Sequence, residues 1–168
     1  MIYDTATLTI RPLEERDLAP LARSLRLSSH HVAGRWLERQ AGRRTSSVAE
    51  LGGEVAGSVS FEERKELSRM LHLYALAVAQ PYQRRGIGAR LVEHVEAQAA
   101  ERGLKGIHLG AGVDNEAALR LYERLGYRRV GEPYTARWTW HGPDGEEQDI
   151  AERCYRMLKH FEAPGTGR

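Results

Sequence analysis

The sequence predicts a single domain of the α/β class, with helices and strands mixed in the α+β manner. Segments with the two-residue periodicity of strands alternate with segments of helical periodicity along all 168 residues. No repeat, low-complexity segment or linker divides the chain. The hydrophobic fraction of 41% and the charged fraction of 29% are typical of a globular domain with a real core. We therefore expect one domain over residues 1–162, followed by a disordered tail at residues 163–168.

The first part of the chain predicts three strands and two helices. In chain order they are expected at residues 7–11 (strand), 14–27 and 30–40 (helices), and 46–51 and 54–61 (strands). The Gly52-Gly53 pair between the last two strands indicates a tight hairpin turn. In the second helix, Val32, Trp36 and Leu37 are expected to face the core.

The remainder of the chain continues the alternation. After a charged loop at residues 64–69, elements are expected at 70–78 (strand), 87–101 (helix), 106–110 (strand), 115–125 (helix), and 127–140 and 149–161 (strands). Residues 70–78 are the strongest strand candidate, because apolar side chains nearly fill them. The helix at 87–101 carries Ile87, Leu91 and Val95 at four-residue spacing, which predicts one buried face, and it is expected to end near Gly103.

Composition argues against several classes of function. The formal net charge is +2 and arginine is spread along the chain, so no basic stripe for nucleic acid is expected. A single cysteine, Cys154, excludes an internal disulfide framework, and seven histidines without HxxxH or HxH spacing imply no metal site. No signal peptide and no apolar run of ~20 residues is visible, so we expect no membrane association and a cytoplasmic location.

Gln83-Arg84-Arg85-Gly86-Ile87-Gly88 is the most informative segment, because it joins the strongest strand to a helix. The first backbone N–H groups of a helix have no partner within it, and the helix dipole adds positive potential there. Gly86 and Gly88 lack Cβ atoms, so a ligand could approach the main chain closely. These features predict a phosphate site. An ordinary glycine-containing loop is the alternative.

Two nucleotide-binding motifs fit this segment poorly. A dinucleotide-binding loop requires G-x-G-x-x-G, and here Leu91 replaces the third glycine. A P-loop requires Gly-Lys-Ser/Thr, which does not follow.

A second motif follows about thirty residues later. It runs Asn115-Glu-Ala-Ala118-Leu-Arg-Leu121-Tyr122-Glu-Arg-Leu125-Gly126-Tyr127. Asn115 and Tyr122 are seven residues apart and would lie on one face of a helix. Together, the two motifs resemble the GNAT (Gcn5-related) N-acetyltransferase family. The glycine loop resembles that family's acyl-CoA loop, and the second motif resembles its N-x-x-A-x-x-L-Y-x-x-x-G-[FY] helix. The resemblance extends to the first strand, the Gly52-Gly53 hairpin and the last strand, and so covers nearly the whole chain.

The resemblance implies a GNAT fold: a central mixed, mostly antiparallel sheet of six to seven strands flanked by about four helices. It also implies acetyl-CoA as cosubstrate. The residues that match the family's cofactor-binding positions are Leu76, Ala77 and Val78 on the strand, Gln83, Arg84, Arg85, Gly86, Ile87, Gly88 and Ala89 in the loop, and Asn115 and Ala118 on the later helix. A helix N-cap is the alternative role for Asn115.

The same resemblance suggests two catalytic residues. Tyr122 matches the family's general acid, which protonates the departing thiolate; core packing is the alternative. His72 lies where some members carry a catalytic glutamate, and alternation would place it on one strand face with Tyr74, Leu76 and Val78. A neutral histidine could accept a proton from the amine, although a structural role or a water chain are alternatives.

We therefore expect an N-acetyltransferase that transfers an acetyl group from acetyl-CoA to a primary amine, most simply that of a small molecule, by direct attack in a ternary complex. The alternatives are a protein lysine or N-terminal acetyltransferase and a non-catalytic acyl-CoA-binding module. A homodimer is a family-level expectation. Trp138 and Trp140 would share one face of a strand, where they could pack against a helix, form a dimer contact or bind the acceptor.

Overall fold

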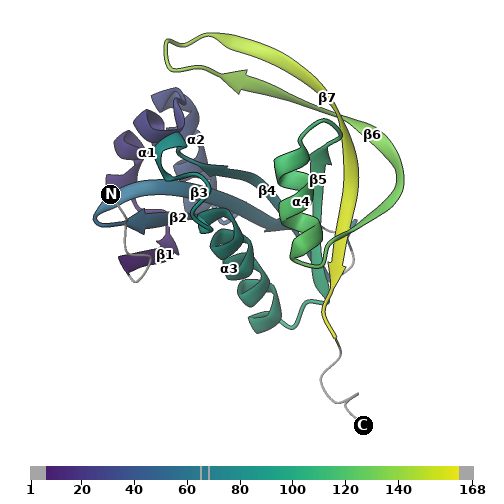
Figure 1. The fold of residues 1–168 in the computed structure, drawn as a ribbon. Helices are drawn as coiled ribbons and strands as arrows, with labels where there is room; N and C mark the ends of the chain where they lie inside the picture. The colour runs from purple at the N-terminus through teal and green to yellow at the C-terminus, as the bar shows by residue number, and fades with distance from the viewer. Residues whose placement is uncertain (1–6, 65, 68, 163–168) are drawn as a thin grey trace.

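The computed structural model describes residues 7–64, 66–67 and 69–162, and it contains one seven-stranded sheet in the order β1-β2-β3-β4-β5-β7-β6 (Figure 1). The strands are β1 (Leu8–Pro12), β2 (Thr45–Leu51), β3 (Glu54–Glu63), β4 (Met70–Val78), β5 (Gly106–Gly112), β6 (Arg128–His141) and β7 (Glu147–His160). The helices are α1 (Leu18–Leu25), α2 (Ser29–Gln40), α3 (Ile87–Glu101) and α4 (Glu116–Arg124), with the short 3-10 helices η2 (Glu15–Asp17) and η3 (Gln80–Tyr82). The predicted fold class and every predicted helix and strand are confirmed. The predicted tail at 163–168 lies outside the described residues.

Strand pairing is antiparallel everywhere except between β4 and β5. That parallel pair is short, because it covers only Met70–His72 of β4 against Gly106–His108 of β5. On its other side β5 pairs with β7 along its full length. The two central strands therefore part after His72, and the sheet opens between them.

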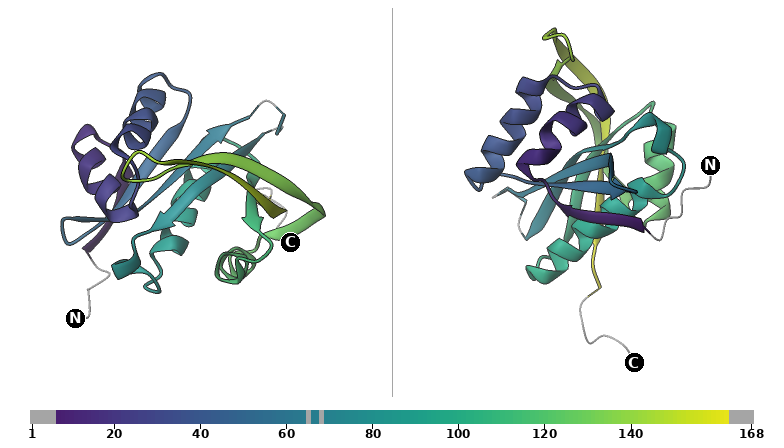
Figure 2. Two further views of the ribbon diagram at one scale, coloured as in Figure 1. Left: turned by 90° about the horizontal axis from the view of Figure 1, so that it is seen from above. Right: turned by 90° about the vertical axis from the view of Figure 1, so that its left-hand side faces the viewer.

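The helices divide between the two faces of the sheet (Figure 2). The apolar faces of α3 and α4 cover one face and form the main core with Phe61, Leu71, Leu91 and Ile107, all of which are fully buried. On the opposite face, α1 and α2 cover a smaller core that includes Val32 and other buried side chains of the N-terminal half. Each face thus has its own packed layer, and the opening between β4 and β5 lies between the two layers.

The orientation of α2 differs from the prediction. Val32 is fully buried and Trp36 packs against the smaller core, as expected, but Leu37 is 64% exposed. Arg35 takes the inward position instead and is only 7% exposed. The helical period explains this, because at 100° per residue Leu37 is rotated by about 140° from Val32, whereas Arg35 is rotated by about 60°. In this helix, the angular position of a residue predicts its burial better than its hydrophobicity does.

A β-bulge in β4 corrects a second prediction. Ser60 of β3 pairs with Tyr74 and Ser58 pairs with Ala77, so β4 holds one extra residue at this point. Ala75 has a φ of 51°, in the left-handed region. The bulge reverses the alternation beyond it. His72 and Tyr74 face the α1/α2 side, whereas Leu76 and Val78 pack with the main core on the α3 side. The four side chains predicted to share one face are therefore split between two.

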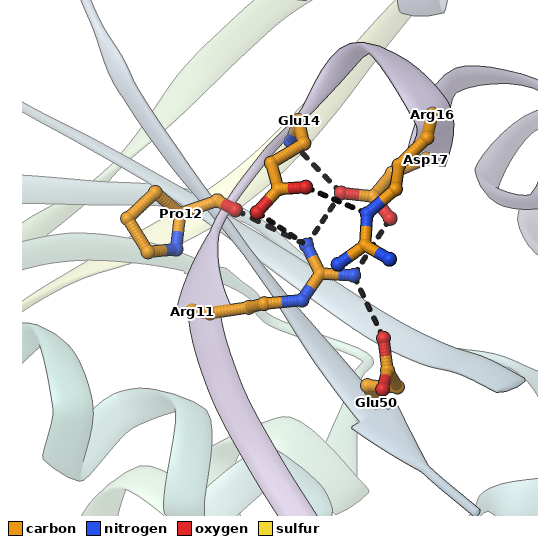
Figure 3. A network of polar contacts seen from close by, with 6 residues as sticks. All are labelled: Arg11, Pro12, Glu14, Arg16, Asp17 and Glu50. Carbon is orange, nitrogen blue, oxygen red and sulfur yellow. Dashed lines mark hydrogen bonds and ion pairs between the residues drawn. The ribbon is translucent and has the colours of Figure 1, made fainter. Parts of the chain in front are cut away.

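A network of charged side chains holds the N-terminal segment to the sheet (Figure 3). The guanidinium of Arg11 on β1 donates to both carboxylate oxygens of Asp17 at 2.7 and 2.8 Å, and to Glu50 of β2 at 2.7 Å. Asp17 is 3% exposed and also accepts the backbone N–H of Glu14 at 2.8 Å. Burial raises the pKa of Asp17, but the hydrogen bonds from Arg11 and from the Glu14 amide outweigh it, and the net pKa lies below 3.8. The ionised carboxylate is thus the form that the fold stabilises.

Asp17→Asn should lower the free energy of unfolding at pH 7 by about 1–3 kcal/mol, because Arg11 loses a charged, buried partner. Since the folded-state pKa of Asp17 is depressed, its contribution is present above the unfolded pKa and is lost as pH falls through the folded pKa. Urea denaturation at several pH values should therefore show the gap between wild type and variant closing in acid. Glu15→Gln, at an exposed position of the same turn, should change stability by less than about 0.5 kcal/mol. A gap that stays constant down to pH 2 would contradict the role given to Asp17.

Candidate active site

The opening between β4 and β5 leaves backbone groups of β4 without a strand partner on one side. Beyond His72, no described residue of β5 pairs with β4. Buried backbone N–H and C=O groups require partners, so an extended ligand could complete this edge as a strand would. Leu76, Ala77 and Val78, which the family resemblance gave as cofactor-binding residues, lie on this part of β4. The last carbonyl of this segment already has a partner, because the Gln83 side-chain amide donates to the carbonyl of Val78 at 3.0 Å.

The loop after β4 ends in a helix N-terminus that carries no side-chain cap. Gly86 is the N-cap of α3 with a φ of 79°, and Arg84 has a φ of 63°. Left-handed residues of this kind turn successive backbone N–H groups toward one side and form anion-binding concavities. The amides of Ile87, Gly88 and Ala89 open the helix and have no acceptor within it. This arrangement fits a diphosphate, which needs several donors at one point.

The individual loop side chains contribute differently. Ile87 is 2% exposed and belongs to the main core, so only its amide can face a ligand. Gly88 lies against α4, where a Cβ would stand 3.5 Å from the Leu121 side chain. Gln83 and Arg84 are exposed, and the Arg85 guanidinium lies 5.8 Å from the centre of the Tyr82 ring. The contact between Gly88 and Leu121 thus places this loop against α4, the helix that carries the second motif.

Asn115 is the N-cap of α4 rather than a residue within it. Its side-chain oxygen accepts the backbone N–H of Ala118 at 3.2 Å, and the residue is exposed. The capping role that the sequence left as an alternative is therefore confirmed. Because Asn115 precedes the helix, the helical-phase argument that aligned it with Tyr122 does not apply. Its amide N–H₂ group remains available to a ligand, since capping uses the oxygen.

Tyr122 lies on the buried face of α4. It is 6% exposed, belongs to the main core, and packs edge-on against Tyr127 with ring centres 5.7 Å apart. Burial raises the pKa of Tyr122 to about 12. The phenol is therefore fully protonated at neutral pH, which is the state a proton donor requires. The packing role is confirmed, and the catalytic role stays a prediction.

His72 pairs with a residue that the sequence did not single out. The Nδ1 atoms of His72 and His108 are 3.1 Å apart across the last β4–β5 pair, so one ring donates a hydrogen to the other. His72 also stacks on Tyr74, with ring centres 5.4 Å apart. Burial, the charge of Arg64 and His108 lower the pKa of His72 to about 3. The pair is thus neutral and lies where the two strands begin to part.

The pairing of His108 with His72 could not be predicted from the sequence, because it depends on the register of the parallel strands β4 and β5. The two histidines are 36 residues apart, and nothing in the sequence fixes which residue of the 106–110 strand lies beside His72. The alternation of side chains along both strands shows only which residues of the 106–110 strand share a sheet face with His72, and does not identify its neighbour.

Polar residues from the N-terminal half line the same side of the sheet. Arg44, just before β2, places its guanidinium 4.8 Å from the centre of the Tyr74 ring and pairs with Glu38 at 2.8 Å. Arg35 lies in the same group. Their charges act on Tyr74 and on each other. This side of β4 is therefore polar and rich in arginine.

The β6–β7 hairpin reaches across to α2 at its far end (Figure 1). The backbone N–H of Ser28 donates to the carbonyl of His141 at 3.2 Å, and the rings of His31 and His141 stack with centres 5.1 Å apart. Trp138, on the same hairpin, is 45% exposed. The far end of the hairpin thus lies against the start of α2, on the polar side of the sheet.

This architecture and its two motifs match a known family. Residues 13–127 match the acetyltransferase (GNAT) family, and this segment includes the strand opening, the glycine loop and α4. The chain belongs to this family. The resemblance stated from the sequence is thereby confirmed.

Two relatives illustrate the similarity in sequence. N-acetyltransferase 8 from Mus musculus is 32% identical over 96 residues, which is 55% of this chain and 42% of the relative. The N-alpha-acetyltransferase of Sulfurisphaera tokodaii is 31% identical over 93 residues, covering 49% of this chain and 56% of the relative. The chain spans about half the length of the curated relatives that it matches.

Solved structures extend the likeness to the whole fold. The ribosomal-protein-S18-alanine N-acetyltransferase from Escherichia coli superposes with a TM-score of 0.68 at 24% identity, over 96% of this chain and 98% of that one. A spermidine N-acetyltransferase from Vibrio cholerae, in complex with CoA and spermine, superposes with a TM-score of 0.69 at 19% identity, over 92% and 96% of the two chains. At these identities the comparison shows a shared fold.

Within residues 7–64, 66–67 and 69–162, no three or more His, Cys, Asp or Glu side chains are grouped so that they could hold a metal ion. None of the helices in the described part is both long and apolar enough to cross a bilayer.

The depressed pKa of His72 gives a direct prediction. Its imidazole should remain neutral from pH 8 down to pH 5, because a pKa of about 3 lies well below that range. The ¹⁵N chemical shifts of the ring, assigned with a His72→Gln variant, should therefore stay constant across this interval. A midpoint near 6.5, as for an unperturbed histidine, would show that the ring is not held in the buried pair.

Proposed function

We propose that this protein is an acetyl-CoA-dependent N-acetyltransferase that transfers the acetyl group to a primary amine of a small molecule. One observation carries the proposal: the open edge of β4 leads directly into the uncapped N-terminus of α3. An acyl-CoA needs both features in this order, since its amide-containing arm can pair with a strand edge and its diphosphate can bind a helix N-terminus. Membership of the acetyltransferase (GNAT) family supports the same conclusion.

In the proposed reaction, a neutral amine attacks the thioester carbonyl and the CoA thiolate leaves. A backbone N–H of Leu76–Val78 would stabilise the developing negative charge on the carbonyl oxygen, and losing such a donor typically costs ~3 kcal/mol of barrier. Tyr122 would donate its phenolic proton to the departing sulfur. The amine loses one proton in return, either to the neutral His72–His108 pair or to water. The low pKa of His72 limits the pair to holding that proton briefly.

The hairpin favours a small acceptor. The β6–β7 hairpin contacts the start of α2 through Ser28, His31 and His141, so the hairpin and α2 meet on the polar side of the sheet and would restrict the size of an acceptor there. A protein lysine or N-terminus is the second candidate, because one similar protein is named for an alanine of a ribosomal protein and another as an N-alpha-acetyltransferase. A cytoplasmic location and a homodimer remain predictions.

The cofactor assignment can be tested with a matched pair of glycines on α3. Gly86 and Gly103 flank the helix, both have positive φ, and a Cβ at either would meet no atom within 4 Å. Gly86→Glu should abolish acetyl-CoA binding in calorimetry, because a carboxylate would occupy the diphosphate position. Gly103→Glu carries the same strain and charge and should bind normally. Equal, micromolar binding by both variants would contradict the loop assignment, and no heat with wild type would contradict the proposed function.

Tyr122→Phe should lower kcat by about 100-fold or more and leave acetyl-CoA affinity nearly unchanged, if the phenol protonates the thiolate. The readout is thiol release from acetyl-CoA on a panel of primary amines. Tyr127→Phe is the control, since it removes the neighbouring hydroxyl, which donates to Glu96 at 3.1 Å, from the same core. Turnover by Tyr122→Phe equal to that of Tyr127→Phe would refute the role of Tyr122. Binding without turnover on any small amine or peptide would instead favour a non-catalytic module.

A further inference from the structure

Arg35 is buried without a partner for its charge. It lies on the inward face of α2, is 7% exposed, and its Nε is buried with no hydrogen-bond partner. None of the ion pairs between described residues includes it. Burial, and then the positive charge of Arg44, lower the pKa of Arg35 to about 10, so it remains protonated at neutral pH. Buried charges normally persist only when they are paired.

The two carboxylates that influence Tyr74, the neighbour of Arg35 in this group, are engaged elsewhere. Glu38 is close enough to influence Arg35 but pairs with Arg44 at 2.8 Å. Glu62 pairs with Arg64 at 2.7 Å and accepts a hydrogen bond from Tyr74 at 3.4 Å. The group therefore contains three arginines and two glutamates, and Arg35 carries the uncompensated charge.

This charge lies beside the proposed reaction centre. Tyr74 is close enough to Arg35 to influence its pKa, and the Arg44 guanidinium lies 4.8 Å from the centre of the Tyr74 ring. Tyr74 in turn stacks on His72, at the point where β4 leaves β5. The guanidinium of Arg35 thus belongs to the polar side of the opening, opposite the face that α3 and α4 cover.

We infer that the acceptor is an amine that also carries an oxyanion, a carboxylate or a phosphate, and that Arg35 binds this group while the amine faces the thioester. This inference rests on the proposed function and narrows its substrate class. The planar guanidinium offers a fork of donors that matches either oxyanion, and Arg44 adds a second positive charge. A polyamine would place further positive charge against an unpaired arginine and is disfavoured.

The test uses paired acceptors with and without the oxyanion, compared at equal concentrations of the neutral amine. L-amino acids are compared with their amides, and O-phosphoethanolamine with ethanolamine, in the thiol-release assay, with spermidine as a polycation. Wild type should prefer at least one of the two anionic classes by about 10- to 100-fold in kcat/KM, the range expected for a charged hydrogen bond. Arg35→Gln should remove the preference by raising KM for the anionic acceptor alone. Arg39→Gln, on the same helix over Trp36, should keep it.

Stability gives a second readout that does not need the right acceptor in the panel. Arg35→Gln and Arg35→Met should raise the Tm, because the unpaired charge opposes folding, whereas a structural arginine would lower the Tm when removed. A lower Tm for both variants would overturn the inference. So would acetylation of neutral amines or spermidine as fast as of the anionic ones, with Arg35→Gln unchanged, although the proposed function would then stand. Failure of acetyl-CoA binding would instead count against the proposed function.

Discussion

The short pairing between β4 and β5 is the constraint on which the rest of the structure depends. Three residue pairs join the two strands, and β5 then follows β7 while β4 follows β3. A sheet can separate in this way only if each strand is held firmly on its outer side. The antiparallel ladders β3–β4 and β5–β7 provide this, and the fully buried Leu71 and Ile107 fix the point of separation. The free backbone groups of β4 follow directly from this geometry.

The bulge at Ala75 gives the opening two different sides. Before the bulge, His72 and Tyr74 lie on the side of the polar residues of α2 and of Arg44, which precedes β2. After the bulge, Leu76 and Val78 pack with the main core. One extra residue therefore lets a single strand present polar side chains to one region and apolar side chains to the next. The cost is a left-handed φ at a residue with a Cβ, which is typical of functional positions.

Much of the fold could be predicted from the sequence, because periodicity is a local property. The run at 70–78, the four-residue spacing on α3 and the Gly52-Gly53 hairpin all lie within single elements or turns. The place of the glycine loop at the N-terminus of α3 was also predictable, since it follows from the local order of strand, loop and helix, whereas diphosphate binding there stays a prediction. What could not be predicted depends on register. The bulge changed which side chains of β4 share a face, and His108 became part of the site only through the parallel pairing. The burial of Arg35 could have been predicted from its angular position on the helix relative to Val32, but the apolar side chain of Leu37 favoured that residue for the buried position.

The placement of the two motifs on one face of the sheet has a consequence for the order of events in catalysis. The glycine loop and α4 lie on the side of α3, whereas Arg35, Arg44 and Tyr74 lie on the side of α2. Under the proposed function, acetyl-CoA would bind from the α3 side of the sheet and the acceptor amine from the α2 side, and the two would meet only between β4 and β5. Neither would obstruct the other's entrance, so the architecture imposes no sequence of arrival, and random-order kinetics are the natural outcome.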